Sequence, residues 1–142
     1  MITAVASNVL LDVLTADPAF GLASREALRS CRTDGSLVAC EVVWAEVSAA
    51  FPETARFVVA MDRLGIRFVP LHGDAATQSG AGWRQYREQG GSRDRVVADF
   101  LVGAHAIHQA DRLLTRDRGF YRRYFDDLTV FDPSRKIPPQ RG

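Results

Sequence analysis

The sequence of 142 residues has little lysine and cysteine, and it has no long hydrophobic run. Of its 18 basic residues, 17 are Arg and only Lys136 is Lys. Cys31 and Cys40 make neither a disulfide framework nor a metal-type spacing, so a reducing, cytoplasmic setting is expected. No apolar run approaches the roughly 20 residues needed to cross a bilayer. Residues 1–11 are apolar but lack a basic start, so we expect no signal peptide and no membrane partner.

The rest of the composition is that of an ordinary globular protein, with 46% hydrophobic and 25% charged residues. The formal net charge of +1 gives no general case for nucleic-acid binding. The arginine bias suits contacts with phosphate, and a GC-rich genome would produce the same bias. The length predicts a single domain with its own hydrophobic core.

Short apolar runs alternate with helical patterns along the chain. The runs predicted to be strands are residues 2–5, 36–40, 66–71, 112–115 and 128–131. The segments predicted to be helices are residues 9–14, 18–34, 41–51, 52–64, 74–89 and 96–110. This alternation predicts an α/β fold with a mainly parallel sheet. Residues 133–142 are basic and rich in proline, so we expect an extended or poorly ordered tail.

Local patterns add predictions about individual helices. Ser7 or Asn8 is expected to cap the first helix, and Asp17 the second, with Pro18 at its first position. The helix of residues 52–64 is expected to turn its apolar face toward the core, and that face comprises Ala55, Val58, Val59 and Leu64.

Asp99 is the only formal charge between residues 96 and 110. A carboxylate among apolar neighbours is costly to ionise unless a cation compensates it. The structural interpretation is an acid near a helix N-terminus, stabilised by the helix dipole and by Arg95. The functional interpretation is a ligand for a metal ion.

Glu46 and Asp117 are candidates of the same kind. Glu46 is the only charge between residues 42 and 51, and it lies close to the predicted buried stripe of its helix. The structural alternative is an acid at the edge of that stripe whose carboxylate reaches out to solvent. Asp117 follows a predicted strand by two residues, at the carboxyl end where α/β proteins place their sites, and the alternative is a turn or N-cap residue. Thr115 offers a hydroxyl group in the same turn. Three acids on three elements predict a site for Mg²⁺ or Mn²⁺, which prefer oxygen ligands.

Four segments together resemble the motifs of PIN domains, and most closely those of VapC toxins from bacterial toxin–antitoxin pairs. They are residues 6–12 (ASNVLLD), 44–47 (WAEV), 98–106 (ADFLVGAHA) and 114–117 (LTRD). They stand in the order and spacing of that family, and the resemblance covers nearly all of residues 1–132, which we take as the domain.

The resemblance implies an α/β/α sandwich with five strands in the order 3-2-1-4-5. It also implies a Mg²⁺-dependent endoribonuclease, a homodimer, and a VapB-type antitoxin that inserts a C-terminal segment into the active-site groove. DNA would be contacted only through the antitoxin. The family's catalytic and metal-binding roles carry over to Glu46, Asp99 and Asp117, while Asn8 and Thr115 match supporting polar positions.

One position departs from the family pattern. The first motif of the family opens with an aspartate, and this chain has Ala6 at that position. The flanking residues Val5, Ser7 and Asn8 match the family motif without any shift in the alignment. Alanine supplies no oxygen ligand, so we expect weak metal binding and little nuclease activity. An engineered inactivation and a naturally inactive homologue both remain open.

Arginines surround the proposed acids, and they are Arg84, Arg87, Arg93, Arg95, Arg116, Arg118, Arg122 and Arg123. They could line a groove for an RNA backbone, or they could be solvated surface charges. Arg116 and Arg118, on either side of Asp117, are the favoured contacts for RNA or the antitoxin.

The sequence has features in common with other classes of protein and site. A non-catalytic PIN fold that binds RNA or an antitoxin remains an alternative. A response-regulator receiver is disfavoured because residues 6–8 hold no acid pair and the only lysine is in the tail. A zinc site at His105 and His108 is disfavoured because no third ligand stands at a suitable spacing.

Overall fold

The computed structural model describes residues 1–91 and 96–134, and its centre is a five-stranded sheet in the order β3-β2-β1-β4-β5. The strands are β1 (Ile2–Val5), β2 (Ser36–Ala39), β3 (Ile66–Phe68), β4 (Arg112–Leu114) and β5 (Val130–Phe131). All four neighbouring pairs are parallel. This confirms the predicted α/β fold and the strand order 3-2-1-4-5.

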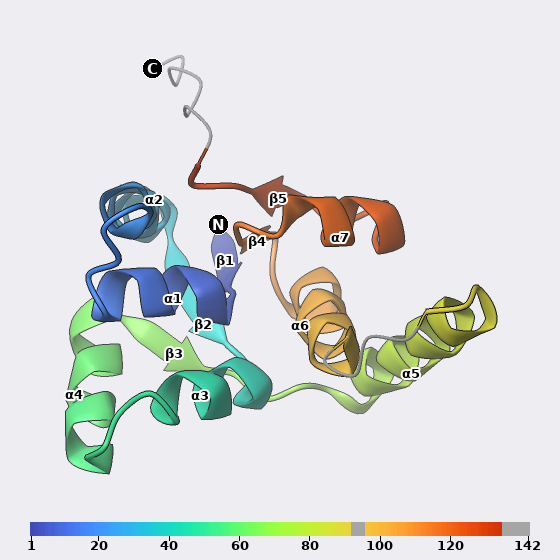
Figure 1. The fold of residues 1–142 in the computed structure, drawn as a ribbon, viewed down its shortest axis with the longest axis horizontal. Helices are drawn as coiled ribbons and strands as arrows, with labels where there is room; N and C mark the ends of the chain where they lie inside the picture. Colours follow the sequence, from blue (N-terminus) through green and yellow to red (C-terminus); the bar gives the residue numbers. More distant parts are fainter. Residues whose placement is uncertain (92–95, 135–142) are drawn as a thin grey trace.

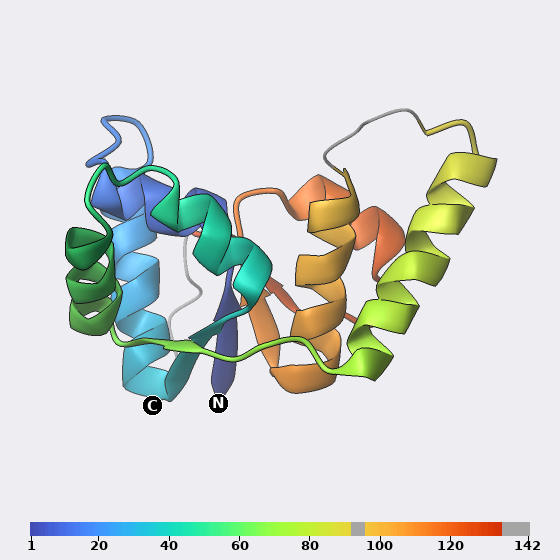
Figure 2. The same cartoon turned by 90° about the horizontal axis from the view of Figure 1, so that it is seen from below.

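The helices form a layer on each side of the sheet (Figures 1 and 2). They are α1 (Ser7–Leu14), α2 (Gly21–Asp34), α3 (Glu41–Ser48), α4 (Thr54–Leu64), α5 (Gly73–Glu88), α6 (Val96–Gln109) and α7 (Arg118–Tyr124). Figure 2 shows α1, α2 and α4 on one side of the strands and α5, α6 and α7 on the other. Helix α3 contacts both groups, through α1 and α6. Among the described residues, none of the helices combines the length and the apolarity that crossing a membrane requires.

The central strands carry the most completely buried residues, because each strand is covered on both faces. Val5 of β1 and Leu113 and Leu114 of β4 are at most 1% exposed. Phe100 of α6 is also 1% exposed and lies among the rings of Tyr86, Phe120, Tyr124 and Phe125. The apolar runs therefore correctly identified the strands, although β2, β3, β4 and β5 are shorter than predicted.

The predicted caps of the first two helices are wrong. Helix α1 begins at Ser7 with Ala6 as its N-cap, because Ser7 and Asn8 use their side chains elsewhere, as described below. Helix α2 begins only at Gly21, with Phe20 as its N-cap, and the Asp17 carboxylate instead caps the turn before it by accepting hydrogen bonds from the backbone of Ala19 and Phe20.

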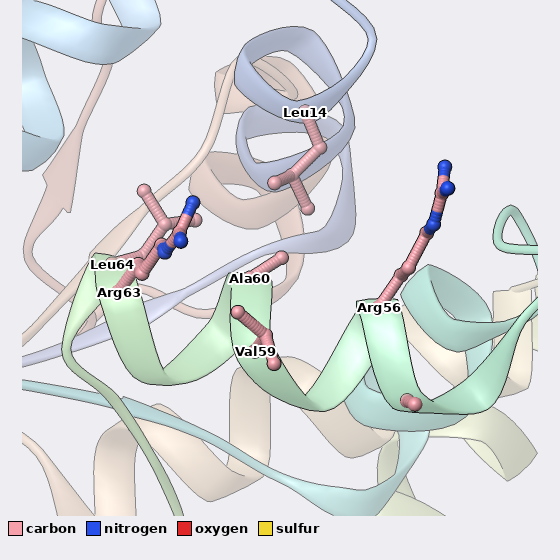
Figure 3. Close-up of a pocket in the computed structure, with 7 residues that line it drawn as sticks. Leu14, Arg56, Val59, Ala60, Arg63 and Leu64 are labelled. Atoms are coloured by element: carbon pink, nitrogen blue, oxygen red, sulfur yellow. The ribbon is translucent and has the colours of Figure 1, made fainter.

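The core face predicted for α4 is wrong at Val58 and Val59, whereas Leu64 packs against the core as predicted. Phe57 and Met61 are the buried residues, whereas Val58 and Val59 are 54% and 49% exposed. Val59 instead lines an apolar groove of about 550 Å³ between α1 and α4. Figure 3 shows Leu14 of α1 above Ala60 and Val59, with arginines toward both ends of the groove. Since Phe57 and Met61 are larger than the valines, their burial removes more apolar surface from water.

Helix α7 lies in a segment to which no helix was assigned, and Asp117 is its N-cap residue, which was one of the two structural alternatives for this acid. The buried residues of α7 are Phe120 and Tyr121, Arg122 and Arg123 are exposed, and Arg118 is half-buried. Arg93, Arg95 and most of the predicted tail, residues 135–142, lie outside the described residues.

Candidate functional site

A cleft of about 600 Å³ opens at the carboxyl edge of the two central strands. Ala6 follows β1 and Thr115 follows β4, and the Ala6 N–H donates a hydrogen bond to the Leu114 carbonyl at 3.0 Å. The residues that line this acidic cleft are Ala6, Ser7, Asn8, Leu11, Asp12, Glu46, Ala98, Asp99, Val102, Arg116, Asp117 and Tyr121. In doubly wound α/β proteins this edge is the usual place for a ligand site.

The cleft brings together the three acids singled out in the sequence. Glu46 comes from α3, Asp99 from α6, and Asp117 is the N-cap residue of α7. Glu46 and Asp99 are half-buried, and Asp117 is exposed. Because each acid reaches the cleft from a different element, the convergence is produced by the tertiary fold. Their catalytic and metal-binding roles stay predictions.

Tyr121 reports the electrostatic character of this cleft. Its side chain is 2% exposed. The pKa of its hydroxyl group is raised mainly by burial, and to a smaller extent by the negative charges of Asp99, Asp117 and Glu46. All three carboxylates therefore act on the same hydroxyl group. The tyrosine stays protonated and retains an O–H that can donate to an anionic group in the cleft.

Hydrogen bonds join the turn after β1 to the turn after β4. The Asn8 Nδ2 donates to Thr115 Oγ1 at 3.1 Å, and the Asn8 Oδ1 accepts from the Arg116 N–H at 3.1 Å. Thr115 Oγ1 also accepts from the Asp117 N–H at 3.1 Å. Both ends of the Asn8 amide are therefore used, and Asp117 is fixed relative to β1. Nearby, the Ser7 hydroxyl donates to Glu46 Oε1 at 3.0 Å.

Arg116 lines the cleft as one half of an ion pair. Its Nε and Nη2 donate to the two oxygens of Asp12 at 2.6 and 3.0 Å, which is a bidentate arrangement. Asp12 is 4% exposed and also accepts from the Ser24 hydroxyl at 2.8 Å. The guanidinium carbon lies 4.0 Å from the centre of the Phe20 ring. Asp12 therefore holds the Arg116 side chain in place at the wall of the cleft.

The structure separates the two arginines that were predicted to act together. Arg116 lines the acidic cleft, whereas Arg118 is the first residue of α7 and is not among the described residues that line it. Sequence reasoning missed Asp12, although it is an isolated acid in an apolar run, like Asp99. The criterion applied to Asp99 would have found it.

The donor set suits a hard cation, but its arrangement is incomplete. Carboxylate oxygens from Glu46, Asp99 and Asp117 are the ligand type that Mg²⁺ and Mn²⁺ prefer. Within residues 1–91 and 96–134, however, no three or more His, Cys, Asp and Glu side chains are grouped so that they could hold a metal ion. Ala6 lines the same cleft, is 5% exposed, and has no side-chain oxygen to contribute. As it stands, the cleft does not fit a tightly held ion.

The histidines of α6 lie outside the acidic cleft. His105 is 1% exposed, and burial lowers the pKa of its imidazole. His108 is hydrogen-bonded to Gln78 of α5. Both histidines thus take part in packing α6 against its neighbours.

The sequence of this chain matches a known protein family. A family described as "PIN domain" matches residues 5–126. The chain belongs to the PIN-domain family. Sequence comparison with curated proteins gives no match.

Solved structures share the fold at low sequence identity. A chain of VapBC2 from Rickettsia felis, bound to a DNA fragment from their promoter, matches with a TM-score of 0.71 and 15% identity over 93% of this chain and 98% of that chain. A chain of VapBC-1 from nontypeable Haemophilus influenzae matches with a TM-score of 0.68 and 16% identity over 95% and 100%. A chain of FitAcB from Neisseria gonorrhoeae matches with a TM-score of 0.66 and 21% identity over 94% of this chain and 98% of that chain. At these identities the likeness shows the fold alone.

Proposed function

We propose that this chain is the toxin component of a VapBC-type toxin–antitoxin pair, with a Mg²⁺-dependent endoribonuclease site that Ala6 has disabled. The observation that carries the proposal is the convergence of Glu46, Asp99 and Asp117 on one cleft at the carboxyl edge of the sheet. Membership of the PIN-domain family and the likeness to chains of VapBC complexes support the same assignment.

Each part of the acidic cleft has a function in this proposal. Glu46, Asp99 and Asp117 are the residues that would bind Mg²⁺ or Mn²⁺ beside the scissile phosphodiester bond. With the missing carboxylate restored, an ion held by these residues would supply an activated water and stabilise charge on the phosphate. Asn8 and Thr115 hold Asp117 in position, as their hydrogen bonds indicate. Arg116 contributes positive charge at the wall, balanced by Asp12.

Ala6 is what sets this chain apart from an active nuclease. It is buried beside the cleft at the end of β1, where an aspartate would project a carboxylate among the other three acids. Without it, the proposed activity is low. RNA binding does not need the missing ligand and is expected to persist.

The proposed partners are an RNA substrate, a VapB-type antitoxin and a second copy of the chain, with DNA contacted only through the antitoxin. For the antitoxin, the apolar groove between α1 and α4 is an available surface in addition to the acidic cleft. Leu14 and Val59 line it, and Arg56 and Arg63 add positive charge, which suits an apolar segment with flanking acids.

A second candidate is a non-catalytic PIN module that binds RNA or an antitoxin and never had nuclease activity. The observation that favours it is the lack, within the described residues, of a group of three or more possible ligands close enough to hold a metal.

The Ala6→Asp variant distinguishes the two. Incubated with single-stranded RNA at millimolar Mg²⁺ or Mn²⁺, it should cleave the RNA, and EDTA should stop the cleavage. The rate should exceed that of the unchanged chain by at least about a hundredfold, since a metal-activated water is the nucleophile. Ala6→Asn is the matched control, because it has nearly the same shape without the charge.

A further control excludes a contaminating ribonuclease. Ala6→Asp combined with Asp99→Asn should return cleavage to the level of the unchanged chain. If Ala6→Asp leaves RNA uncut at either metal, the non-catalytic module becomes the better description.

A further inference from the structure

A second hollow adjoins the acidic cleft, between the C-terminal end of α5 and the start of α7. It has a volume of about 470 Å³, within the range of about 300–1,000 Å³ typical of small-molecule sites. Asp117 lines both this aromatic pocket and the acidic cleft. A ligand that extends over Asp117 can therefore occupy both at once.

The floor of the aromatic pocket is a set of packed rings. Tyr86 and Phe120 are 8% and 9% exposed, and Tyr124 is half-buried. The Tyr124 ring centre lies 5.6 Å from that of Tyr86 and 5.0 Å from that of Phe120. Phe100 of the core lies 5.5 Å from Tyr124. Since the rings hold one another in place, they offer a rigid surface for a flat apolar ligand.

Gly90 and Gly91 line one side of the aromatic pocket. Gly90 has a φ of +86°, a left-handed conformation that favours glycine. A Cβ atom at Gly91 would lie 2.2 Å from the Tyr86 ring, so no larger residue fits there without displacing it. The two glycines therefore let the chain turn closely against Tyr86, and neither of them adds a side chain to the pocket.

A cation stands at the rim. The Arg123 guanidinium carbon lies 5.4 Å from the centre of the Tyr124 ring, and Arg123 is exposed. Arginine above an aromatic surface is suited to a ligand that is both flat and anionic, because it stacks and it binds phosphate through its planar fork. Arg122, the next residue on α7, is equally exposed but does not line the pocket.

We propose that the aromatic pocket is a nucleotide subsite for single-stranded RNA, in which a base stacks on Tyr124 and its phosphate contacts Arg123. The inference rests on the proposed function, since the adjoining acidic cleft would hold the scissile phosphate. The strand would cross Asp117 and place a neighbouring nucleotide in the pocket. Stacking on an aromatic ring accepts every base, so this subsite adds affinity with little sequence preference.

The first test uses the chain with Ala6, which should bind RNA without cutting it. The readout is the fluorescence anisotropy of a short fluorescein-labelled single-stranded RNA, titrated at a fixed salt concentration because phosphate contacts depend on salt. Arg123→Gln should weaken binding about tenfold. Arg122→Gln removes the same charge from the same helix, and it should change the affinity by less than about twofold.

A second variant fills the pocket without touching the rings. A Cβ at Gly119, which lines the pocket, meets no atom within 4 Å, so Gly119→Gln should fold normally and occupy space that a base would use. Gly73→Gln is the matched control, because a Cβ there also meets no atom within 4 Å and Gly73 begins α5, away from the pocket. Only Gly119→Gln should weaken RNA binding.

The outcomes separate the subsite from the proposed function. If the unchanged chain binds no RNA, the proposed function fails and the subsite with it. If the chain binds RNA but Arg123→Gln matches Arg122→Gln and Gly119→Gln matches Gly73→Gln, the proposed function stands and the subsite is overturned. Selective loss in Arg123→Gln and Gly119→Gln supports the subsite.

Discussion

Two neighbouring hollows share Asp117, and they are built in opposite ways. The acidic cleft takes its polar residues from α1, α3, α6 and the turn after β4, and hydrogen bonds connect several of them. The aromatic pocket takes its residues from two helices and the turns beside them, and packed rings form its floor. The cleft therefore depends on polar bonds between distant segments, and the pocket on shape.

This difference determines how each hollow fails. A cleft that lacks one carboxylate, as we propose for Ala6, would keep its walls and lose its chemistry. A pocket formed by interlocking rings loses its shape and part of the fold together when the packing is disturbed. The variants below break one hollow at a time, and they run from the largest expected effect to the smallest.

Arg116→Leu should be the most destabilising change in the acidic cleft. It leaves the buried Asp12 carboxylate with the Ser24 hydroxyl but without its cation, and removing one partner of a buried ion pair costs about 3 kcal/mol. Urea denaturation measures the free energy of unfolding. The double variant with Asp12→Ala should lose less than the sum of the two single changes. A loss below about 1 kcal/mol would mean that the pair is an ordinary surface salt bridge.

Gly91→Ala should be the corresponding change in the aromatic pocket. The added methyl group overlaps the Tyr86 ring, and overpacking of this kind costs about 2 kcal/mol. Gly119→Ala, in the same pocket, meets no atom within 4 Å and should shift stability by no more than about 0.5 kcal/mol. Thermal unfolding of the two variants makes the comparison. Equal melting temperatures would show that the ring packing against Gly91 is loose.

Asn8→Ala should have a smaller effect. It removes two hydrogen bonds that join the turns after β1 and β4, and each contributes about 1 kcal/mol or less. We expect a loss of about 1.5 kcal/mol in urea denaturation. In the Ala6→Asp background, Asn8→Ala should also reduce RNA cleavage, because Asp117 is less firmly placed. Full activity in that background would remove Asn8 from the supporting role.

Arg118→Ala should have the smallest effect on stability. Arg118 is half-exposed at the first position of α7 and stands outside both hollows, so unfolding should change by at most about 0.5 kcal/mol. Its effect on RNA binding should be weaker than that of Arg123→Gln. A stronger effect would place the RNA path along the outer side of α7 instead of across the pocket.

The same contrast explains what could be predicted from sequence. Glu46 and Asp99 were conspicuous as single charges in apolar segments, and Asp117 as an acid just after a strand. The order of their elements places all three at one sheet edge. Buried strands were equally visible as short apolar runs. The strand order itself came from the family resemblance, because local periodicity carries no information on which strands are neighbours.

The aromatic pocket could not be predicted in this way. Tyr86 lies far along the chain from Phe120 and Tyr124, and only tertiary packing brings them together. Helix α7 has charged residues next to aromatic ones, so it lacks a clear apolar stripe. The α4 prediction failed for a related reason. Valines and larger apolar residues lie on different faces, and the sequence alone does not say which face meets the core.

The central claim is that the acidic cleft is a metal site short of one carboxylate. Thermal unfolding of Ala6→Asp, with and without Mn²⁺, tests it most directly. Without metal, the added buried charge beside three other acids should make the variant less stable than the unchanged chain. Millimolar Mn²⁺ should then raise its melting temperature, because an ion bound only by the folded state stabilises it. Ala6→Asn should show no such response. A melting temperature of Ala6→Asp that Mn²⁺ leaves unchanged would contradict the account.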